Sequence, residues 1–188
     1  MTRPGPHDEQ LAAYAALLRS WAPRLDLVSP ADLARLESRH IEDSLRALPL
    51  VDLASPGPGV DVGSGGGFPG IPLCIAGRSR SWRLLEPRSR RAAFLEEAIR
   101  LLELDAEVIV ATAEEAASSS ALTGHAVATA RALASPEVAF ALLGPLVRPD
   151  GLRIVWAGPR AESPPDAGVW EPGLLTMPPV NNVREKLE

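Results

Sequence analysis

The sequence lacks several features that mark particular classes of protein. Its single cysteine, Cys74, cannot form an internal disulfide, and its apolar surroundings favour a small buried thiol. No window approaches the apolar length of a membrane span, and residues 1–7 lack the apolar core of a signal peptide. These absences predict a cytoplasmic protein with no membrane association.

Positive charge is also scarce, and common catalytic signatures are missing. The chain carries 19 basic and 24 acidic residues, and Lys186 is its only lysine. The net charge of −5 argues against a broadly basic nucleic-acid surface, although a local patch can still bind RNA. There is no Ser/His/Asp arrangement, Walker loop or cysteine cluster, and His40, Glu42 and Asp43 are too few for a metal site. We therefore expect no metal.

Two groups of arginines stand out in this acidic chain. They are Arg78, Arg80 and Arg83, and Arg88, Arg90 and Arg91. Most such groups are solvated faces, but one of these could also contact phosphates.

The sequence pattern predicts helices in the N-terminal part of the chain. Apolar residues recur at helical spacing over residues 8–22, and Ser29-Pro30-Ala31-Asp32 offers the N-cap of a second helix that runs through Leu45. A linker rich in proline and glycine follows at residues 55–59. We expect an N-terminal helical appendage over residues 1–55 and one further structural unit over residues 56–188.

From residue 60 onward, strand and helix patterns alternate. The expected strands are 59–63, 82–86, 107–111, 125–130 and 151–156, and the expected helices are 69–77, 88–102, 113–118 and 135–146. This alternation predicts an α/β fold, a Rossmann-like three-layer sandwich around a parallel sheet. A further strand is expected at 169–175, and the polar tail at 180–188 is not predicted to form a buried strand. Ligands of such sheets bind at the carboxyl ends of the strands, which singles out Gly63, Glu86, Ala113, Glu114 and Arg131.

The segment from Asp61 to Gly70, D-V-G-S-G-G-G-F-P-G, predicts a strand, a glycine loop and a helix start. Its glycines let a ligand approach the backbone closely, and a carboxylate at Asp61 suits a positive charge such as the amino group of a methionine moiety. The pattern D-x-G-x-G-x-G, with Gly63 and Gly65, is typical of S-adenosylmethionine-dependent methyltransferases. The same string contains a dinucleotide-type G-x-G-x-x-G ending at Gly70, but Pro69 there marks a helix start. A glycine turn without a ligand is the third interpretation.

Acidic and small residues follow the next two strands. Glu86 can accept hydrogen bonds from both hydroxyls of a ribose, or can pair with Arg88 or Arg90. Ala113 leaves room for an adenine ring whose exocyclic amine Glu114 and its backbone amide can bond. Alternatively, Glu114 only complements the dipole of a helix N-terminus.

Arg131 follows the fourth expected strand, beside the expected position of a reactive methyl group. It could hold a cofactor carboxylate or a substrate phosphate, or it could form a structural salt bridge to an acid of the N-terminal helices. His40 and Asp43 share a face of the second helix, which we expect to edge the cofactor cleft.

These motifs resemble the bacterial ribosomal RNA small subunit methyltransferase G family (RsmG/GidB) over roughly residues 10–160. The matching segments are W-A-P-R-L-D-L-V-S at 21–29, H-I-E-D-S-L at 40–45, D-V-G-S-G-G-G-F-P-G-I-P-L at 61–73, R-A-A-F-L at 91–95 and T-A-R-A-L-A at 129–134. The G-F-P-G-I-P-L extension is far more specific than the generic glycine pattern.

The resemblance implies methylation of guanine N7 in the decoding-region loop of 16S rRNA. The partner would be 16S rRNA or a precursor of the small subunit, and the cofactor would be S-adenosylmethionine. The resemblance implies cofactor contacts at Gly63, Phe68, Ala113, Glu114 and Arg131, beside the strand-end acid Glu86. Arg131 is then also the candidate for positioning in catalysis, and we expect a monomer.

Two departures from the family pattern leave alternatives open. Ala157 stands where the family usually has a lysine, and the chain has no obvious equivalent of a final apolar strand at the sheet edge. A methyltransferase with another substrate, or a catalytically silent homologue that binds S-adenosylmethionine or RNA, is therefore the alternative. A nicotinamide dehydrogenase fits poorly because Asp61 is the wrong charge for a pyrophosphate neighbourhood.

Overall fold

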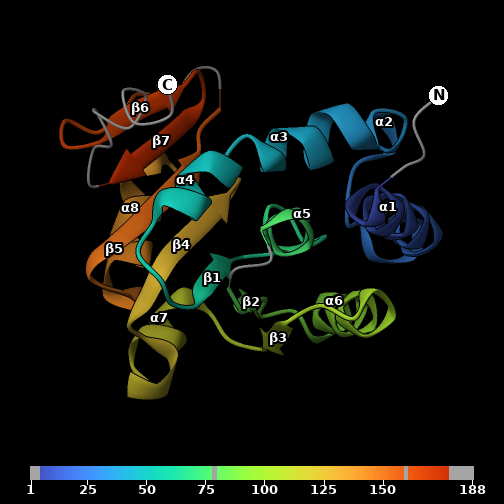
Figure 1. Ribbon diagram of the computed structural model, residues 1–188, viewed down its shortest axis with the longest axis horizontal. Helices are drawn as coiled ribbons and strands as arrows, with labels where there is room; N and C mark the ends of the chain where they lie inside the picture. Colours follow the sequence, from blue (N-terminus) through green and yellow to red (C-terminus); the bar gives the residue numbers. More distant parts are fainter. Residues whose placement is uncertain (1–4, 78–79, 159–160, 178–188) are drawn as a thin grey trace.

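The computed structural model describes residues 5–77, 80–158 and 161–177 (Figure 1). Its sheet has the order β3-β2-β1-β4-β5-β7-β6. The strands are β1 (Gly59–Val62), β2 (Trp82–Leu85), β3 (Ala106–Ile109), β4 (His125–Arg131), β5 (Val147–Trp156), β6 (Gly168–Glu171) and β7 (Leu174–Met177). The first five strands run parallel, with β1 and β4 side by side at the centre. The expected α/β class and the five expected strands are confirmed, although β5 begins at Val147 rather than at residue 151.

Helices follow the strands as the alternating pattern predicts. They are α5 (Gly70–Ala76), α6 (Ser89–Leu102), α7 (Ala113–Ala117) and α8 (Pro136–Leu143), with 3-10 turns at η2 (Ser120–Leu122) and η3 (Gly144–Leu146). Among the described residues, no helix combines the length and apolar character that a membrane crossing requires.

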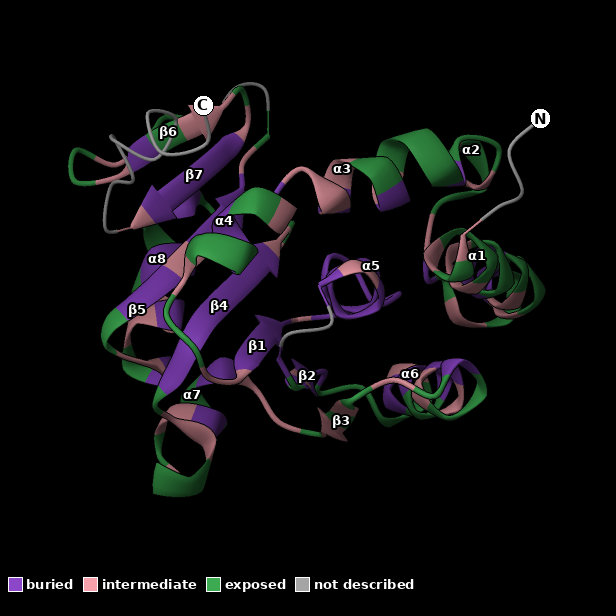
Figure 2. Cartoon of the chain, viewed as in Figure 1, coloured by how far each residue is buried: buried purple, intermediate pink, exposed green. Residues whose placement is uncertain are grey.

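The sheet is covered by helices on both faces, and successive residues of a strand pack into the cores on opposite faces. Leu84 of β2 belongs to the core that α5 and α6 cover, whereas the next residue, Leu85, belongs to the core that α7 and α8 cover. Both side chains are almost completely buried, as is the whole of β1 (Figure 2). This double burial produces the three-layer sandwich that the alternation of strands and helices predicts.

The far edge of the sheet differs from the expectation. The single strand expected at 169–175 is two strands, β6 and β7, separated by a turn at Gly173 with φ +77°. β7 pairs antiparallel with β5, with Leu175 opposite Val155, so the expectation that no apolar strand completes this edge is wrong. The Pro172-Gly173 turn interrupts the apolar run, which is why the pattern obscures the hairpin. The polar tail at 180–188 lies outside the described residues.

The N-terminal segment forms α1 (Pro6–Leu25), α2 (Pro30–Leu33), a π-helix η1 (Glu37–Glu42), α3 (Asp43–Leu45) and α4 (Leu48–Leu53). The Ser29 N-cap is confirmed, since its hydroxyl accepts from the Asp32 amide at 3.1 Å. The prediction of one continuous second helix is wrong, because α2 ends at Leu33 and the chain continues as the wider π-helix η1. Arg131 donates to the carbonyls of Arg39 and His40, which stabilises that widened turn.

The N-terminal helices share a core with the sheet. Tyr14 and Leu18 of α1 are completely buried in the same cluster as Ile71 of α5 and Leu84 of β2. The side chains of the two segments therefore pack together in one core. A boundary between two structural units at residue 55 stays a prediction.

Candidate functional site

The glycine loop leaves β1 at its carboxyl end and leads into α5. Gly63, Gly65 and Gly67 have φ of +71°, +55° and +92°, the left-handed region that favours glycine. A Cβ on Gly63 would lie 2.8 Å from Leu133 Cδ1, and one on Gly67 would lie 2.6 Å from Ile71 Cγ1. A Cβ on Gly65 would have only the Gly63 carbonyl oxygen nearby, at 3.8 Å. The loop is thus tightly packed at its sides and open at Gly65, where a ligand can reach the backbone.

Asp61 supports this loop from inside the protein. Its side chain is completely buried, with Oδ2 accepting from the Gly70 amide at 3.2 Å and Oδ1 accepting from the Thr129 hydroxyl at 2.7 Å. Burial raises the pKa of this carboxyl to about 6, and the two hydrogen bonds oppose that rise. The geometry therefore gives Asp61 contacts to the start of α5 and to β4, and an influence on a ligand through the loop backbone.

Glu86, just beyond β2, connects two backbone segments at the carboxyl edge of the sheet. Its Oε2 accepts from the Gly65 amide at 2.9 Å and its Oε1 accepts from the Arg88 amide at 2.9 Å. The side chain is only 2% exposed. The expected alternative partner was the Arg88 or Arg90 guanidinium, but among the described residues Glu86 is bonded to backbone amides instead. Glu86 thus holds Gly65 in place at the open part of the loop.

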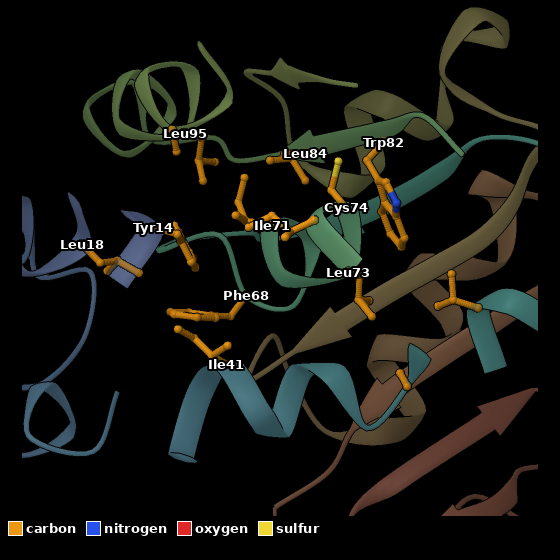
Figure 3. Close-up of a cluster of buried hydrophobic side chains, with 14 of the residues drawn as sticks. Tyr14, Leu18, Ile41, Phe68, Ile71, Leu73, Cys74, Trp82, Leu84 and Leu95 are labelled. Atoms are coloured by element: carbon orange, nitrogen blue, oxygen red, sulfur yellow. The ribbon is translucent and has the colours of Figure 1, made fainter. Parts of the chain in front are cut away.

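Phe68 anchors the loop against the N-terminal helices. Its ring lies 5.6 Å from the ring of Tyr14 and 4.9 Å from that of His40, measured between centroids. Figure 3 shows Phe68 between Tyr14 of α1 and Ile41 of η1. The Tyr14 hydroxyl also donates to the Gly66 carbonyl, and burial raises the pKa of Tyr14 well above its usual value, so this hydroxyl stays protonated. The N-terminal helices therefore shape the glycine loop directly.

Arg131 ends β4 and contacts the N-terminal segment. Its guanidinium donates to the carbonyls of Arg39 at 2.8 Å and His40 at 3.3 Å, and it lies 3.3 Å from Asp43 Oδ2. Burial lowers the pKa of Arg131, and the nearby Asp43 carboxylate opposes this shift. The expected structural salt bridge to an N-terminal acid is present. Together with the tilted contact between the rings of His40 and Phe68, these contacts connect the end of β4 to the glycine loop; that the helix of His40 and Asp43 edges a cofactor cleft stays a prediction.

Ala113 and Glu114 begin α7, beyond the end of β3. Ala113 is 6% exposed and packs in the core with Val62 and Leu85, whereas Glu114 is exposed. Thr112 and Glu115 form a reciprocal capping box at this helix start. No hydrogen bond among the described residues joins Ala113 or Glu114 to the glycine loop. They share the carboxyl edge of the sheet with the loop, as the strand order requires.

The structure thus connects most of the predicted site residues. Asp61 and Glu86 bond the glycine loop, Phe68 belongs to it, and Arg131 reaches it through His40. No group of three or more metal-ligating side chains lies together in the described ranges. Sequence reasoning missed the role of Tyr14, which lies within the helical pattern at residues 8–22. Tyr14 is the only tyrosine of the chain, and a buried hydroxyl requires a hydrogen-bond partner, which was the available signal.

Comparisons with known proteins identify a single family. The family model described as rRNA small subunit methyltransferase G matches residues 7–164. The ribosomal RNA small subunit methyltransferase G of Acidiphilium cryptum is 41% identical over 155 residues, which cover 81% of this chain and 69% of that relative. Its counterpart from Gluconobacter oxydans is 40% identical over 156 residues, covering 82% and 77%.

Solved structures support the fold. A putative methyltransferase, yhhF from Escherichia coli, aligns with a TM-score of 0.54 at 16% identity, covering 79% of this chain and 85% of that chain. A mutant of MtNAS in complex with S-adenosylmethionine aligns with a TM-score of 0.56 at 16% identity, covering 89% and 72%. At these identities the likeness concerns the Rossmann-like architecture alone.

Proposed function

We propose that this chain, which belongs to the rRNA small subunit methyltransferase G family, transfers a methyl group from S-adenosylmethionine to N7 of a guanosine in 16S rRNA. The family gives its class, an S-adenosylmethionine-dependent rRNA methyltransferase. The position of the guanosine in the decoding-region loop, a monomeric state and a cytoplasmic location are further parts of the proposal.

The observation that carries the proposal is the glycine loop at the carboxyl end of β1. Its backbone is open at Gly65, and that residue is fixed by Glu86. A loop that is close-packed on its flanks and open at its centre fits a ligand that contacts the main chain. It lies where α/β sheets bind their ligands.

Each predicted site residue has a place in this cofactor proposal. Gly63, Gly65 and Phe68 would line the cofactor, and the ribose hydroxyls would meet Glu86, whose carboxylate oxygens keep a second lone pair each. Ala113 and Glu114 would face the adenine. Asp61 would act through the loop, because its own oxygens already accept from Gly70 and Thr129. Arg131 would position the N-terminal helices against the site.

The proposed reaction needs positioning more than acid–base chemistry. When bound, S-adenosylmethionine supplies an electrophilic methyl group. Guanine N7 has a free lone pair and carries no proton, so no general base has to expose it. The residues of this chain would orient the two reactants and exclude water. The guanine must be accessible, which favours an unpaired or splayed-out base.

Ala157 favours a second candidate, a homologue that binds the cofactor or RNA without turnover. It follows β5 at the carboxyl edge of the sheet, where its amide donates to the Gly173 carbonyl at 2.9 Å. An alanine there offers no charge to a phosphate or a leaving group. This candidate predicts normal cofactor binding and no methyl transfer.

The experiment that separates these candidates incubates the protein with methyl-labelled S-adenosylmethionine and small-subunit RNA from a strain that lacks the family enzyme. Naked 16S rRNA and the isolated small subunit are both offered as substrates. Label on guanine N7 is the expected result. Cofactor binding by calorimetry without any label would refute the methyltransferase proposal for these substrates and favour the silent homologue.

A further inference from the structure

The arginines of the described residues differ in what their guanidinium groups contact. Most of them donate to a carboxylate or a carbonyl, as Arg19 does to Glu37 and Arg100 to Glu97. The guanidinium groups of three arginines have no such partner within the described ranges: Arg24, Arg88 and Arg90. All three are exposed. In a chain with a net charge of −5, these unpaired cations require an explanation.

The three unpaired arginines lie at one end of a pair of antiparallel helices. Gln10 near the start of α1 donates to the carbonyl of Leu102 at the end of α6, at 2.8 Å. Farther along, the rings of Trp21 and Phe94 lie 5.8 Å apart. The end of α1 therefore lies beside the start of α6, and Figure 1 shows the two helices as neighbours.

Arg91 joins the two helices at this end, since its guanidinium donates to the carbonyl of Asp26, the C-cap residue of α1, at 3.0 Å. Arg24 lies in the last turn of α1, and Arg88 and Arg90 lie at the start of α6. We call Arg24, Arg88, Arg90 and Arg91 the arginine rim.

The arginine rim borders the glycine loop on two sides. Glu86 accepts from the amides of both Gly65 and Arg88, so a single carboxylate separates the loop from the rim. On the other side, the carbonyl oxygen of Leu27 lies 3.2 Å from where a Cβ on Gly66 would be. A ligand held by the rim would therefore lie next to the proposed cofactor site.

The placement of Arg88 and Arg90 is unfavourable for the isolated protein, whereas Arg24, in the last turn of α1, complements the dipole of that helix. Cations near a helix N-terminus oppose the helix dipole, and the first turn of α6 contains no acidic residue to compensate them. The nearby acids are Asp26, which is exposed, and Glu86, which is buried and bonded to backbone amides. Neither packing nor ion pairing explains why Arg88 and Arg90 are there, but an anionic partner would.

We propose that the arginine rim binds the phosphates of the single-stranded rRNA segment that carries the target guanosine. This inference rests on the proposed function, because it takes rRNA as the substrate. Arginine forks bind phosphate oxygens well, and such contacts orient a nucleic acid without reading its sequence. The rim thus brings the RNA backbone beside the glycine loop, and base selection is left to other residues.

The test measures RNA affinity against salt concentration for the full chain and an in vitro transcript of 16S rRNA. The double variant Arg88→Gln/Arg90→Gln is compared with Arg19→Gln/Arg100→Gln, which removes the same charge from two arginines that are ion-paired elsewhere. A triple variant adds Arg24→Gln. S-adenosylmethionine affinity and melting temperature are measured for every variant, because substitutions outside the cofactor site should change neither greatly.

The negative slope of the log of the RNA association constant against the log of the salt concentration should become shallower by about 0.7 for each phosphate that an arginine no longer neutralises. The triple variant should therefore bind RNA about fiftyfold more weakly near physiological salt and approach wild type at the highest salt. The ion-paired control should keep the wild-type slope. An unchanged slope in the Arg88→Gln/Arg90→Gln variant would overturn the proposal. Methyl transfer by the wild type is scored separately, so failure of the proposed function remains distinguishable from failure of the rim to bind RNA.

Discussion

Replacing Asp61 by asparagine tests whether a buried carboxylate supports the glycine loop. The asparagine carbonyl can accept from the Gly70 amide as the carboxylate does. Its NH₂ group can donate to the Thr129 hydroxyl, which can itself donate to the Val60 carbonyl 3.4 Å away. The variant should therefore fold and keep the loop, while removing the one ionisable group at this position.

The magnitude follows from the pKa of Asp61. Burial raises that pKa from 3.8 to about 6, so the folded state disfavours the ionised carboxylate by about 3 kcal/mol. Because the folded pKa is above the unfolded one, this penalty is absent below about pH 4 and fully present above about pH 6. The variant has no such penalty at any pH. The free energy of unfolding of the wild type, relative to Asp61→Asn, should therefore fall by about 3 kcal/mol as the pH rises across this window.

The assay is urea unfolding of both proteins at a series of pH values, followed by the fluorescence of the four tryptophans. Other titrating groups are common to the two proteins and cancel in the difference. Asp61→Ala serves as a second comparison, since it leaves the Gly70 amide unpaired and should cost about 1–3 kcal/mol for that group, whereas the Thr129 hydroxyl can still donate to the Val60 carbonyl. A difference between wild type and Asp61→Asn that stays constant with pH would refute this reasoning.

Three other substitutions test the contacts around the loop. Tyr14→Phe removes the hydrogen bond to the Gly66 carbonyl; it should cost about 1–2 kcal/mol of stability and weaken S-adenosylmethionine binding, measured by denaturation and calorimetry. Glu86→Gln sets an amide NH₂ against one of the two backbone amides, so cofactor affinity should fall about tenfold while Glu107→Gln, on an exposed acid of β3, leaves it unchanged. Arg131→Ala removes the donor to the Arg39 carbonyl and one of the two guanidinium partners of Asp43, which keeps Arg46, so it should lower stability by about 1–2 kcal/mol; a normal unfolding midpoint would contradict the structural role.

Much of the sheet and of the loop could be predicted from local sequence. Strand and helix positions from residue 59 onward follow from alternation and from proline and glycine signals, since these act over a few residues. The Ser29 cap is local in the same way. The hairpin of β6 and β7 and the π-helix η1 were not predicted, because both depend on partners outside their own segments: β5 for the hairpin and Arg131 for η1.

Local sequence was enough to predict that a glycine loop follows β1, because left-handed backbone and close packing there require residues without a Cβ. It was also enough to predict which residues lie at the strand ends. The contacts of those residues, in contrast, depend on how distant segments pack together. Tyr14 reaches Gly66 from 52 positions away, Asp61 turns inward to Gly70 and Thr129, and Arg131 pairs with Asp43. A buried polar group must find a partner, but which partner it finds is set by packing between segments that lie far apart in the chain.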